Sequence, residues 1–168
     1  MRRGWVVAAA GAVVVGVAAL VVWWPSGGDD GLPPARARVY ADFSTCLLTA
    51  EQGLASPGVP PVWAGLQDAS ADTTTKVSYL AAAGPATDAN YLPYLNSLVQ
   101  RRCDVIVTVG QPGTAVAVSQ AAAHPGIRFV TVGGSGQPGA NVSPVGVSEH
   151  VREDVAGAVR EAAHAAGH

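Results

Sequence analysis

The sequence predicts an α/β fold built on an open, doubly wound parallel sheet, and a matched pair of segments carries this prediction. Cys103 to Gly110 (CDVIVTVG) and Ile127 to Gly134 (IRFVTVGG) are each a short run of β-branched residues that ends in glycine. Strands buried on both faces of a parallel sheet have this pattern. Between them, Thr114 to His124 is Ala-rich and helical, and Pro125-Gly126 ends the helix. We therefore expect a strand–helix–strand unit, with any ligand at the carboxyl ends of the strands.

The elements before this unit follow from shorter patterns. The buried part of the first strand is expected at Thr45 to Thr49, which contains three consecutive apolar residues. Ala50 to Pro61 is rich in glycine and proline and is predicted to be a long loop. A helix is expected to begin with Val62 to Ala69, and the second strand is expected at Lys76 to Ala82.

The remaining elements complete the alternation of strands and helices. Asp88 is expected to cap a helix that runs to about Arg102. Gly133 to Gly139 is predicted to be a mobile loop. Val142 to Val147 is a fifth strand, placed at an edge because it contains Pro144. Glu149 to Ala166 forms a last amphipathic helix. The simplest strand order for this alternation is 2-1-3-4-5.

The amino terminus is expected to be a membrane anchor. Arg2 and Arg3 precede an uncharged apolar run, residues 5–24, which is long enough to span the ~30 Å of a bilayer core as a helix. A cleaved signal peptide is the alternative, although its apolar region is normally only ~7–15 residues long. The predicted organisation is an anchor at residues 1–24, a flexible Gly/Pro-rich linker at 25–36 and an α/β lobe at 37–168, with the lobe outside the cytoplasm.

Composition narrows the function classes. The net charge is −2 and only 13% of residues are charged, so no basic face is expected for nucleic acid. Lys76 is the one lysine of the chain, a bias typical of a GC-rich bacterial genome.

The two cysteines are predicted to form a disulfide. Cys46 and Cys103 begin the buried parts of strands that are neighbours in a 2-1-3 order, so both sulfurs lie at the same end of the sheet. An extracytoplasmic compartment is oxidising and favours the bond. Two buried free thiols are the alternative.

Several segments together resemble the basic membrane protein family. They are VWAGLQDA (Val62 to Ala69), KVSYL (Lys76 to Leu80), LNSLVQRRCDVIVTVG (Leu95 to Gly110) and FVTVG (Phe129 to Gly133). Members of this family are substrate-binding components of ABC transporters, related to bacterial purine-nucleoside receptors, with the type I periplasmic-binding fold. The resemblance covers Thr45 to Ala163 and implies the first of two lobes. The chain departs from the family in its first loop, which lacks the base-stacking aromatic residue, and after the fourth strand, where glycines replace aspartate.

The resemblance implies a binding site at the strand ends. The candidate ligand-binding residues are Thr49, Ala50, Glu51, Gln52, Gly110, Gln111, Gly113, Gly133 and Gly134. We expect no catalytic residues, no cofactor and no metal. Gly134-x-Gly136-x-x-Gly139 spells a dinucleotide fingerprint. Pro138 and the NVSPV segment that follows the motif are not expected to form the helix that it needs. His164 and His168 have metal-ligand spacing without further ligand groups nearby.

These observations lead to two hypotheses for a non-enzymatic protein. The first is a membrane-tethered, extracytoplasmic solute-binding lobe linked to ABC transport, with a permease or a separate second-lobe protein as its partner. The alternative is a degenerate receptor lobe that acts as a protein-interaction module on the cell surface. In both cases the protein is expected in the cell membrane as a single-pass protein, with its C-terminal domain outside.

Overall fold

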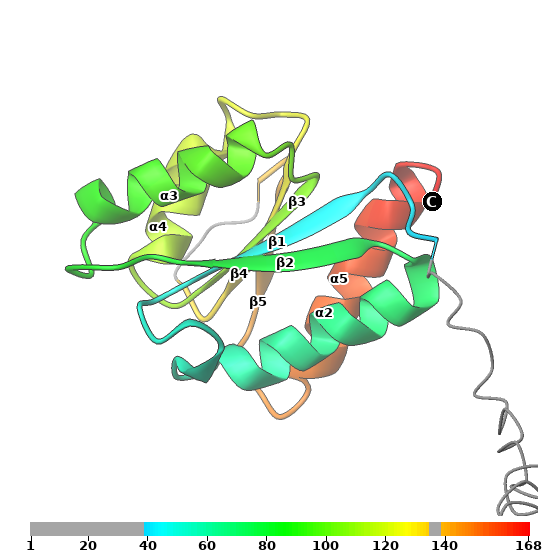
Figure 1. Cartoon of the computed structure of the whole chain (residues 1–168), viewed down its shortest axis with the longest axis horizontal. Coiled ribbons are helices and arrows are strands. Elements are labelled where there is room, and N and C mark those ends of the chain that lie inside the picture. Colours follow the sequence, from blue (N-terminus) through cyan, green and yellow to red (C-terminus); the bar gives the residue numbers. More distant parts are fainter. Residues whose placement is uncertain (1–38, 135–138) are drawn as a thin grey trace, which may run out of the picture. The chain divides into compact units, whose positions relative to one another are not determined.

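The chain folds around a five-stranded sheet whose strand order, β2-β1-β3-β4-β5, is the predicted one (Figure 1). The computed structural model describes residues 39–134 and 139–168. All neighbouring strands are parallel. The strands are β1 (Ser44–Thr49), β2 (Lys76–Ala81), β3 (Val105–Val109), β4 (Arg128–Val132) and β5 (Val142–Val145).

Helices cover both faces of the sheet, which makes the fold doubly wound (Figure 1). On one face lie α2 (Val59–Thr73) and α5 (Val151–Ala165), and on the other α3 (Asp88–Gln100) and α4 (Gly113–Ala121). A short 3₁₀ helix, η1 (Gly53–Ala55), follows β1. Because side chains alternate along a strand, each strand supplies both cores. Leu47 and Val107 pack under α2 and α5, whereas Leu48 and Ile106 pack under α3.

The predicted loop from Ala50 to Pro61 is shorter than expected. η1 occupies its middle, and α2 begins at Val59 instead of Val62. Pro60 and Pro61 therefore lie in the first turn of a helix. Proline is favoured there because the first amides of a helix have no partner within it. The prolines mark the start of this helix and not the end of a loop.

The cap of α3 also differs from the prediction. Thr87, not Asp88, is the N-cap residue, and its hydroxyl accepts a hydrogen bond from the Asn90 amide at 3.3 Å. Asp88 lies in the first turn, where a carboxylate suits the positive end of the helix dipole. The helix ends at Gln100, and Arg102 follows in the left-handed conformation with φ 58°.

The carboxyl-terminal third has the predicted order of elements with shorter bounds. β5 is an edge strand, as its proline predicts, and it ends at Val145. Helix α5 begins at Val151. Residues 135–138 of the predicted loop lie outside the described residues.

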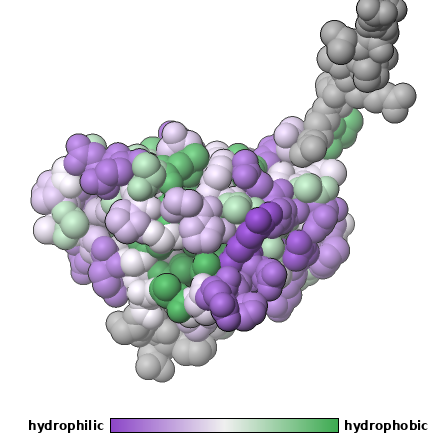
Figure 2. Space-filling model, turned by 90° about the horizontal axis from the view of Figure 1, so that it is seen from below, coloured by the Kyte–Doolittle hydropathy of each residue, from purple (hydrophilic) through white to green (hydrophobic). Residues whose placement is uncertain are grey.

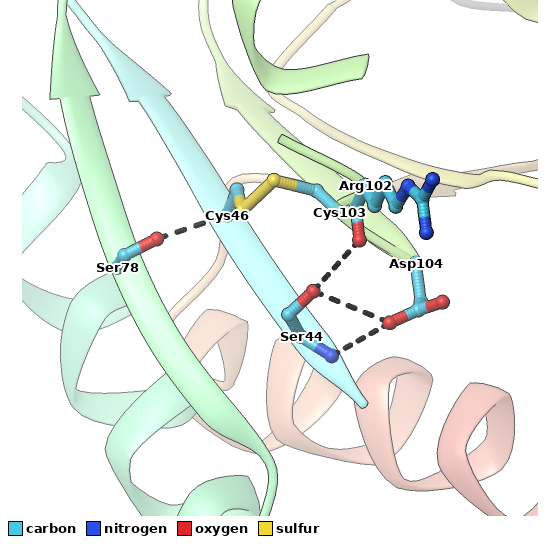
Figure 3. Close-up of a disulfide and its surroundings, with 6 residues drawn as sticks. All are labelled: Ser44, Cys46, Ser78, Arg102, Cys103 and Asp104. Carbon is cyan, nitrogen blue, oxygen red and sulfur yellow. Dashed lines mark hydrogen bonds between the residues drawn. A yellow bond between two sulfur atoms is a disulfide. The ribbon is translucent and has the colours of Figure 1, made fainter. Parts of the chain in front are cut away.

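The disulfide between Cys46 and Cys103 is confirmed (Figure 3). Cys46 is on β1 and Cys103 lies just before β3, with Cα atoms 5.9 Å apart. Beside it, Asp104 accepts hydrogen bonds from the Ser44 amide at 2.7 Å and the Ser44 hydroxyl at 3.2 Å. Covalent and polar contacts therefore hold the starts of two neighbouring strands together.

The predicted anchor and linker, residues 1–24 and 25–36, lie outside the described residues. Within residues 39–134 and 139–168, no helix has both the length and the apolar character that crossing a bilayer requires.

Candidate functional site

The predicted site residues follow three strands that are adjacent in the sheet. Because β1, β3 and β4 are parallel neighbours, their carboxyl ends lie at the same end of the sheet. The structure therefore brings the three predicted stretches, which follow β1, β3 and β4, to this one end of the sheet. Their ligand-binding role remains a prediction.

The first stretch is mostly occupied with its own loop. Thr49 is buried, and its hydroxyl donates to the carbonyl of Ala50 at 3.1 Å. The Ala50 carbonyl also accepts from the Gly53 amide at 2.9 Å. Glu51 and Gln52 are exposed in the turn that leads into η1. Only these last two present polar side chains to solvent.

The second stretch forms the turn into α4. Gly110 has φ 65°, a conformation that favours glycine, and its carbonyl accepts from the Thr114 amide at 3.0 Å. Gln111 is exposed and Gly113 is buried. A Cβ atom on Gly113 would lie 3.7 Å from the ring of Tyr91, so side chains of α3 and β3 cover the start of α4. Burial raises the pKa of the Tyr91 hydroxyl.

The third stretch packs closely against its neighbours. Gly133 has φ 69°, and a Cβ atom there would lie 2.7 Å from Val147. A Cβ atom on Gly134 would collide with the side chain of Thr114. Glycine is therefore required for close packing at Gly134, which explains one residue of the fingerprint-like spelling. Gly139 is followed by β5 and not by a helix, so the dinucleotide motif lacks its structural context.

Two cavities are lined by other residues. One, of about 270 Å³, is at the opposite end of the sheet and is lined by Phe43, Asp104, Arg128, Asn141 and the end of α5. The other, of about 460 Å³, lies between β5 and α5. None of the nine candidate residues lines either cavity. Within residues 39–134 and 139–168, no three His, Cys, Asp or Glu side chains gather as metal ligands would.

A cluster of buried threonine hydroxyls was missed by the sequence analysis. Thr108 and Thr131 are register partners on β3 and β4, on the face covered by α4, and Thr114 lies in the first turn of α4. All three side chains are buried, and their hydroxyls have no hydrogen-bond partner among the described residues. Threonine is ordinary in strands, so no sequence signal distinguishes these three.

The predicted strand order places β2 at an edge, but the sequence analysis did not consider its outward backbone groups as a binding surface. The Lys76 amide donates to Phe43 and the Ala82 amide donates to Thr49, so the even-numbered residues of β2 bond to β1. Alternation then points the N–H and C=O groups of Val77, Tyr79 and Ala81 outward. No described residue pairs with these groups. We call these three residues the free β2 edge.

The opposite edge of the sheet is closed in two ways. The outward groups of Val142 pair with Gly139, in both directions, at 3.2 and 3.3 Å. The next outward residue, Pro144, has no N–H to donate. The two edges of one sheet therefore differ, and only the free β2 edge offers a continuous row of outward groups.

An aromatic pair flanks the free β2 edge. Tyr79 is 47% exposed, and its ring meets the ring of Trp63 on α2 edge-on, with centroids 5.9 Å apart. Figure 2, which views the side on which α2 and α5 lie, shows a largely hydrophilic surface with small hydrophobic patches. The exposed apolar surface on this side is therefore limited to small patches.

No family model matches this chain, and no curated protein does. Solved structures show similarity at the level of the fold. One is a fragment of a protein described as a lipoprotein from Peptoclostridium difficile 630, with a TM-score of 0.55 and 14% identity over 74% of this chain and 97% of that chain. This likeness establishes the fold alone.

Two further structures are more distant. The C-domain of LpoA (YraM) from Haemophilus influenzae, a regulator of PBP1A, has a TM-score of 0.47 and 13% identity over 74% of this chain and 48% of that chain. A pilus assembly-related protein from Burkholderia pseudomallei K96243 has a TM-score of 0.46 and 15% identity over 77% of this chain and 96% of that chain.

The resemblance to the basic membrane protein family is therefore wrong. No family model supports it, and the solved structure with a TM-score of 0.55 is described as a lipoprotein and not as a receptor of that family. The function that it implied, solute binding linked to ABC transport, therefore has no support. The physical reason is that short β-branched runs ending in glycine occur wherever a parallel strand is buried on both faces. The quoted motifs are therefore typical of the fold and do not indicate a particular family.

Proposed function

We propose that this chain is an extracytoplasmic protein-interaction domain whose binding surface is the free β2 edge. The observation that carries the proposal is the row of outward, unpaired backbone groups at Val77, Tyr79 and Ala81. An extended segment of a partner can add to such an edge as a further strand, with main-chain hydrogen bonds supplying affinity.

The composition of β2 supports this role. Natural edge strands are commonly protected by charges, prolines or bulges. Between Val77 and Ala82 the chain has neither a charge nor a proline, and Lys76 stands only at the start of the strand. An edge left open in this way is suited to pairing, whereas Pro144 and Gly139 close the edge at β5.

The aromatic pair provides an anchor beside the backbone groups. Trp63 contacts the Tyr79 ring edge-on, and Gly53 lies close to the same ring, since a Cβ atom there would be in van der Waals contact with it at 3.4 Å. Tyrosine and tryptophan dominate the binding energy of many protein interfaces. A Tyr79 held by its neighbours loses little side-chain freedom on binding.

The disulfide supports a location outside the cytoplasm. Cys46 and Cys103 are bonded, and the chain has no other cysteine. Such bonds persist in oxidising compartments and are rare in the cytosol. Together with the apolar run at residues 5–24, this favours a domain tethered to a membrane on its outer side. Binding without catalysis is part of the same proposal.

A photo-reactive phenylalanine derivative at position 79 of the full-length protein tests the binding surface. In producing cells, irradiation is expected to give discrete crosslinked species. The Val77→Pro change should abolish them, because it removes an outward N–H and leaves every bond from β2 to β1 in place. The matched Lys76→Pro change removes the inward bond to Phe43 and should instead lower the melting temperature.

The same probe placed at Ser143 on β5 serves as the comparison, because that edge is closed. Crosslinks of equal yield from positions 79 and 143, or crosslinks from position 79 that persist in the Val77→Pro protein, would contradict binding through the free β2 edge.

A further inference from the structure

We propose that the occupant of the free β2 edge is a second copy of this chain, added as an antiparallel strand centred on Tyr79. This inference rests on the proposed function, because it needs the same edge to be available, and it names the partner. The assembly is a symmetric dimer in which the two sheets join into one.

The register follows from the hydrogen-bonding groups. In an antiparallel ladder, directly opposite residues alternate between hydrogen-bonded and non-bonded pairs. When Tyr79 lies opposite Tyr79 of the second copy, Val77 lies opposite the second copy's Ala81, and Ala81 lies opposite the second copy's Val77. Every outward residue of one strand then meets an outward residue of the other. Shifting the centre to Ser78 or Leu80 leaves one outward residue of each β2 strand without such a partner.

The side chains are compatible with this register. On the face of α2, the two Tyr79 rings become cross-strand neighbours beside the two Trp63 rings, and aromatic cross-strand pairs are favourable. On the other face, Ser78 meets Leu80 of the second copy. No charged residue lies between Val77 and Ala82, so like charges do not face each other. The two Lys76 side chains lie at opposite ends of the joined strands.

Charge on α3 favours the antiparallel direction. Asp88 is exposed at the start of α3, and Arg101 and Arg102 are exposed just after its end. None of the three has an ion-pair partner among the described residues. The two-fold axis places both α3 helices on the same face of the joined sheet, over the β1 strands and in opposite directions, so the acidic start of one and the basic end of the other lie at the same end of the joined sheet. Parallel joining would turn one sheet over and place the two α3 helices on opposite faces of the joined sheet, where these charges cannot attract each other.

The closed edge at β5 limits the assembly to two copies. Pairing between two β2 strands uses the same surface on both partners, which is an isologous interface. The remaining edge of each sheet carries Pro144 and the Gly139 bridge and cannot extend the ladder. The structure thus favours a dimer over a fibre.

Disulfide crosslinking in the full-length protein tests the register. Opposite residues of a hydrogen-bonded pair have Cα atoms about 5.5 Å apart, which lies within the about 4.4–6.8 Å that a disulfide spans. A mixture of Val77→Cys and Ala81→Cys proteins should form a covalent dimer on mild oxidation, whereas neither protein should do so alone. Residues 77 and 81 are on the sheet face opposite Cys46, so the native disulfide stays intact. Adding Tyr79→Pro to both proteins should abolish the crosslink.

Hydrogen exchange of the Val77, Tyr79 and Ala81 amides separates the alternatives. Protection that grows with protein concentration, together with the mixed crosslink, supports the dimer. A monomer whose edge amides exchange fast at every concentration overturns the dimer and leaves the edge free for another protein. A monomer whose edge amides are protected at every concentration shows that another segment of the chain covers the edge, and overturns both proposals.

Discussion

Buried hydroxyls without partners are the most unusual residue-scale feature of this protein. Thr108, Thr114 and Thr131 lie together between the sheet and α4, and each hydroxyl is buried. A buried polar group without a partner costs about 1–3 kcal/mol. Glycine at position 134 keeps this region tightly closed, because a Cβ atom there would collide with Thr114.

Replacing Thr131 by valine should therefore leave stability unchanged or raise it, by up to about 1 kcal/mol, because an apolar group of the same shape removes the unpaired hydroxyl. Urea denaturation measures the difference. Thr73→Val is the matched control, since the Thr73 hydroxyl donates to the Ala69 carbonyl at 2.8 Å, and its loss should be destabilising. A destabilised Thr131→Val protein would show that this hydroxyl does have a partner.

At the scale of elements, α2 and α5 make the most extensive helix–helix contact of the described fold. Gly65 on α2 lies against the backbone of Arg152 on α5, and a Cβ atom there would be 3.2 Å from the Arg152 carbonyl carbon. The pair is also bridged by Arg152, which donates to both carboxylate oxygens of Asp68 at 2.7 and 2.8 Å. The small residue and the ion pair together set how closely the helices approach.

Gly65→Ala should destabilise the protein by about 1–3 kcal/mol, because the added methyl group forces the helices apart. Gly157→Ala on α5 is the control, since nothing lies within 4 Å of its Cβ position. That change should stabilise the protein by about 0.5–1 kcal/mol through helix propensity. Thermal unfolding of both variants measures the effects. An equal response of the two variants would contradict the close-contact explanation.

The ion pair predicts a small acid dependence of stability. The hydrogen bonds from Arg152 hold the pKa of Asp68 below its ordinary value of 3.8. A carboxylate whose pKa is lower in the folded state contributes its full stability above its unfolded pKa. This contribution is lost as the pH falls from the unfolded pKa through the folded pKa. Asp68→Asn should flatten the pH dependence of the urea midpoint below about pH 5, where carboxylates titrate, and Arg152→Gln should do the same. An unchanged slope in both variants would refute this role. The pair is exposed, so high salt should weaken it.

At the scale of the whole molecule, the disulfide links strands that are distant in sequence. Cys46 and Cys103 are separated by 57 positions, so the bond closes a long loop in the unfolded chain. The chain-entropy model gives about 4 kcal/mol of stabilisation for a loop of this size. The hydrogen bonds between Ser44 and Asp104 hold the same two segments (Figure 3).

Replacing both cysteines by alanine should lower the free energy of unfolding by about 4 kcal/mol in urea titration. Ser78→Ala serves as the control, because it removes only the contact of the Ser78 hydroxyl with the Cys46 sulfur at 3.5 Å. A loss below about 1 kcal/mol on removing the disulfide would mean that the unfolded chain already holds the two segments together.

Local sequence pattern was sufficient for the strands, their order and the disulfide. The β-branched runs before Gly110 and Gly133 are strands, as such runs in buried parallel sheets predict, and the observed order is the simplest one for alternating strands and helices. The bounds were less predictable where a residue has two uses. Pro60 and Pro61 suit a loop or a first helical turn, and Thr87 and Asp88 can both cap a helix.

The candidate site depended on knowledge that local patterns do not contain. The sequence predicted that the three stretches lie at the same end of the sheet, since the strand order is enough for that prediction. It did not reveal that the hydroxyls of Thr108, Thr114 and Thr131 are buried without partners, or that Gly139 closes β5 while the outward groups of β2 stay unpaired among the described residues. The motif resemblance failed for the same reason, because motifs of this length describe a strand end and not a binding surface.

The sequence by itself therefore predicted the strands, their parallel order and the pairing of Cys46 with Cys103, because these depend on periodicity and on the chirality of crossovers. Only the tertiary structure decided which backbone groups remain unpaired. That property belongs to the free β2 edge as a whole. It depends on the direction in which Val77, Tyr79 and Ala81 point once β1 has taken the groups on the other side.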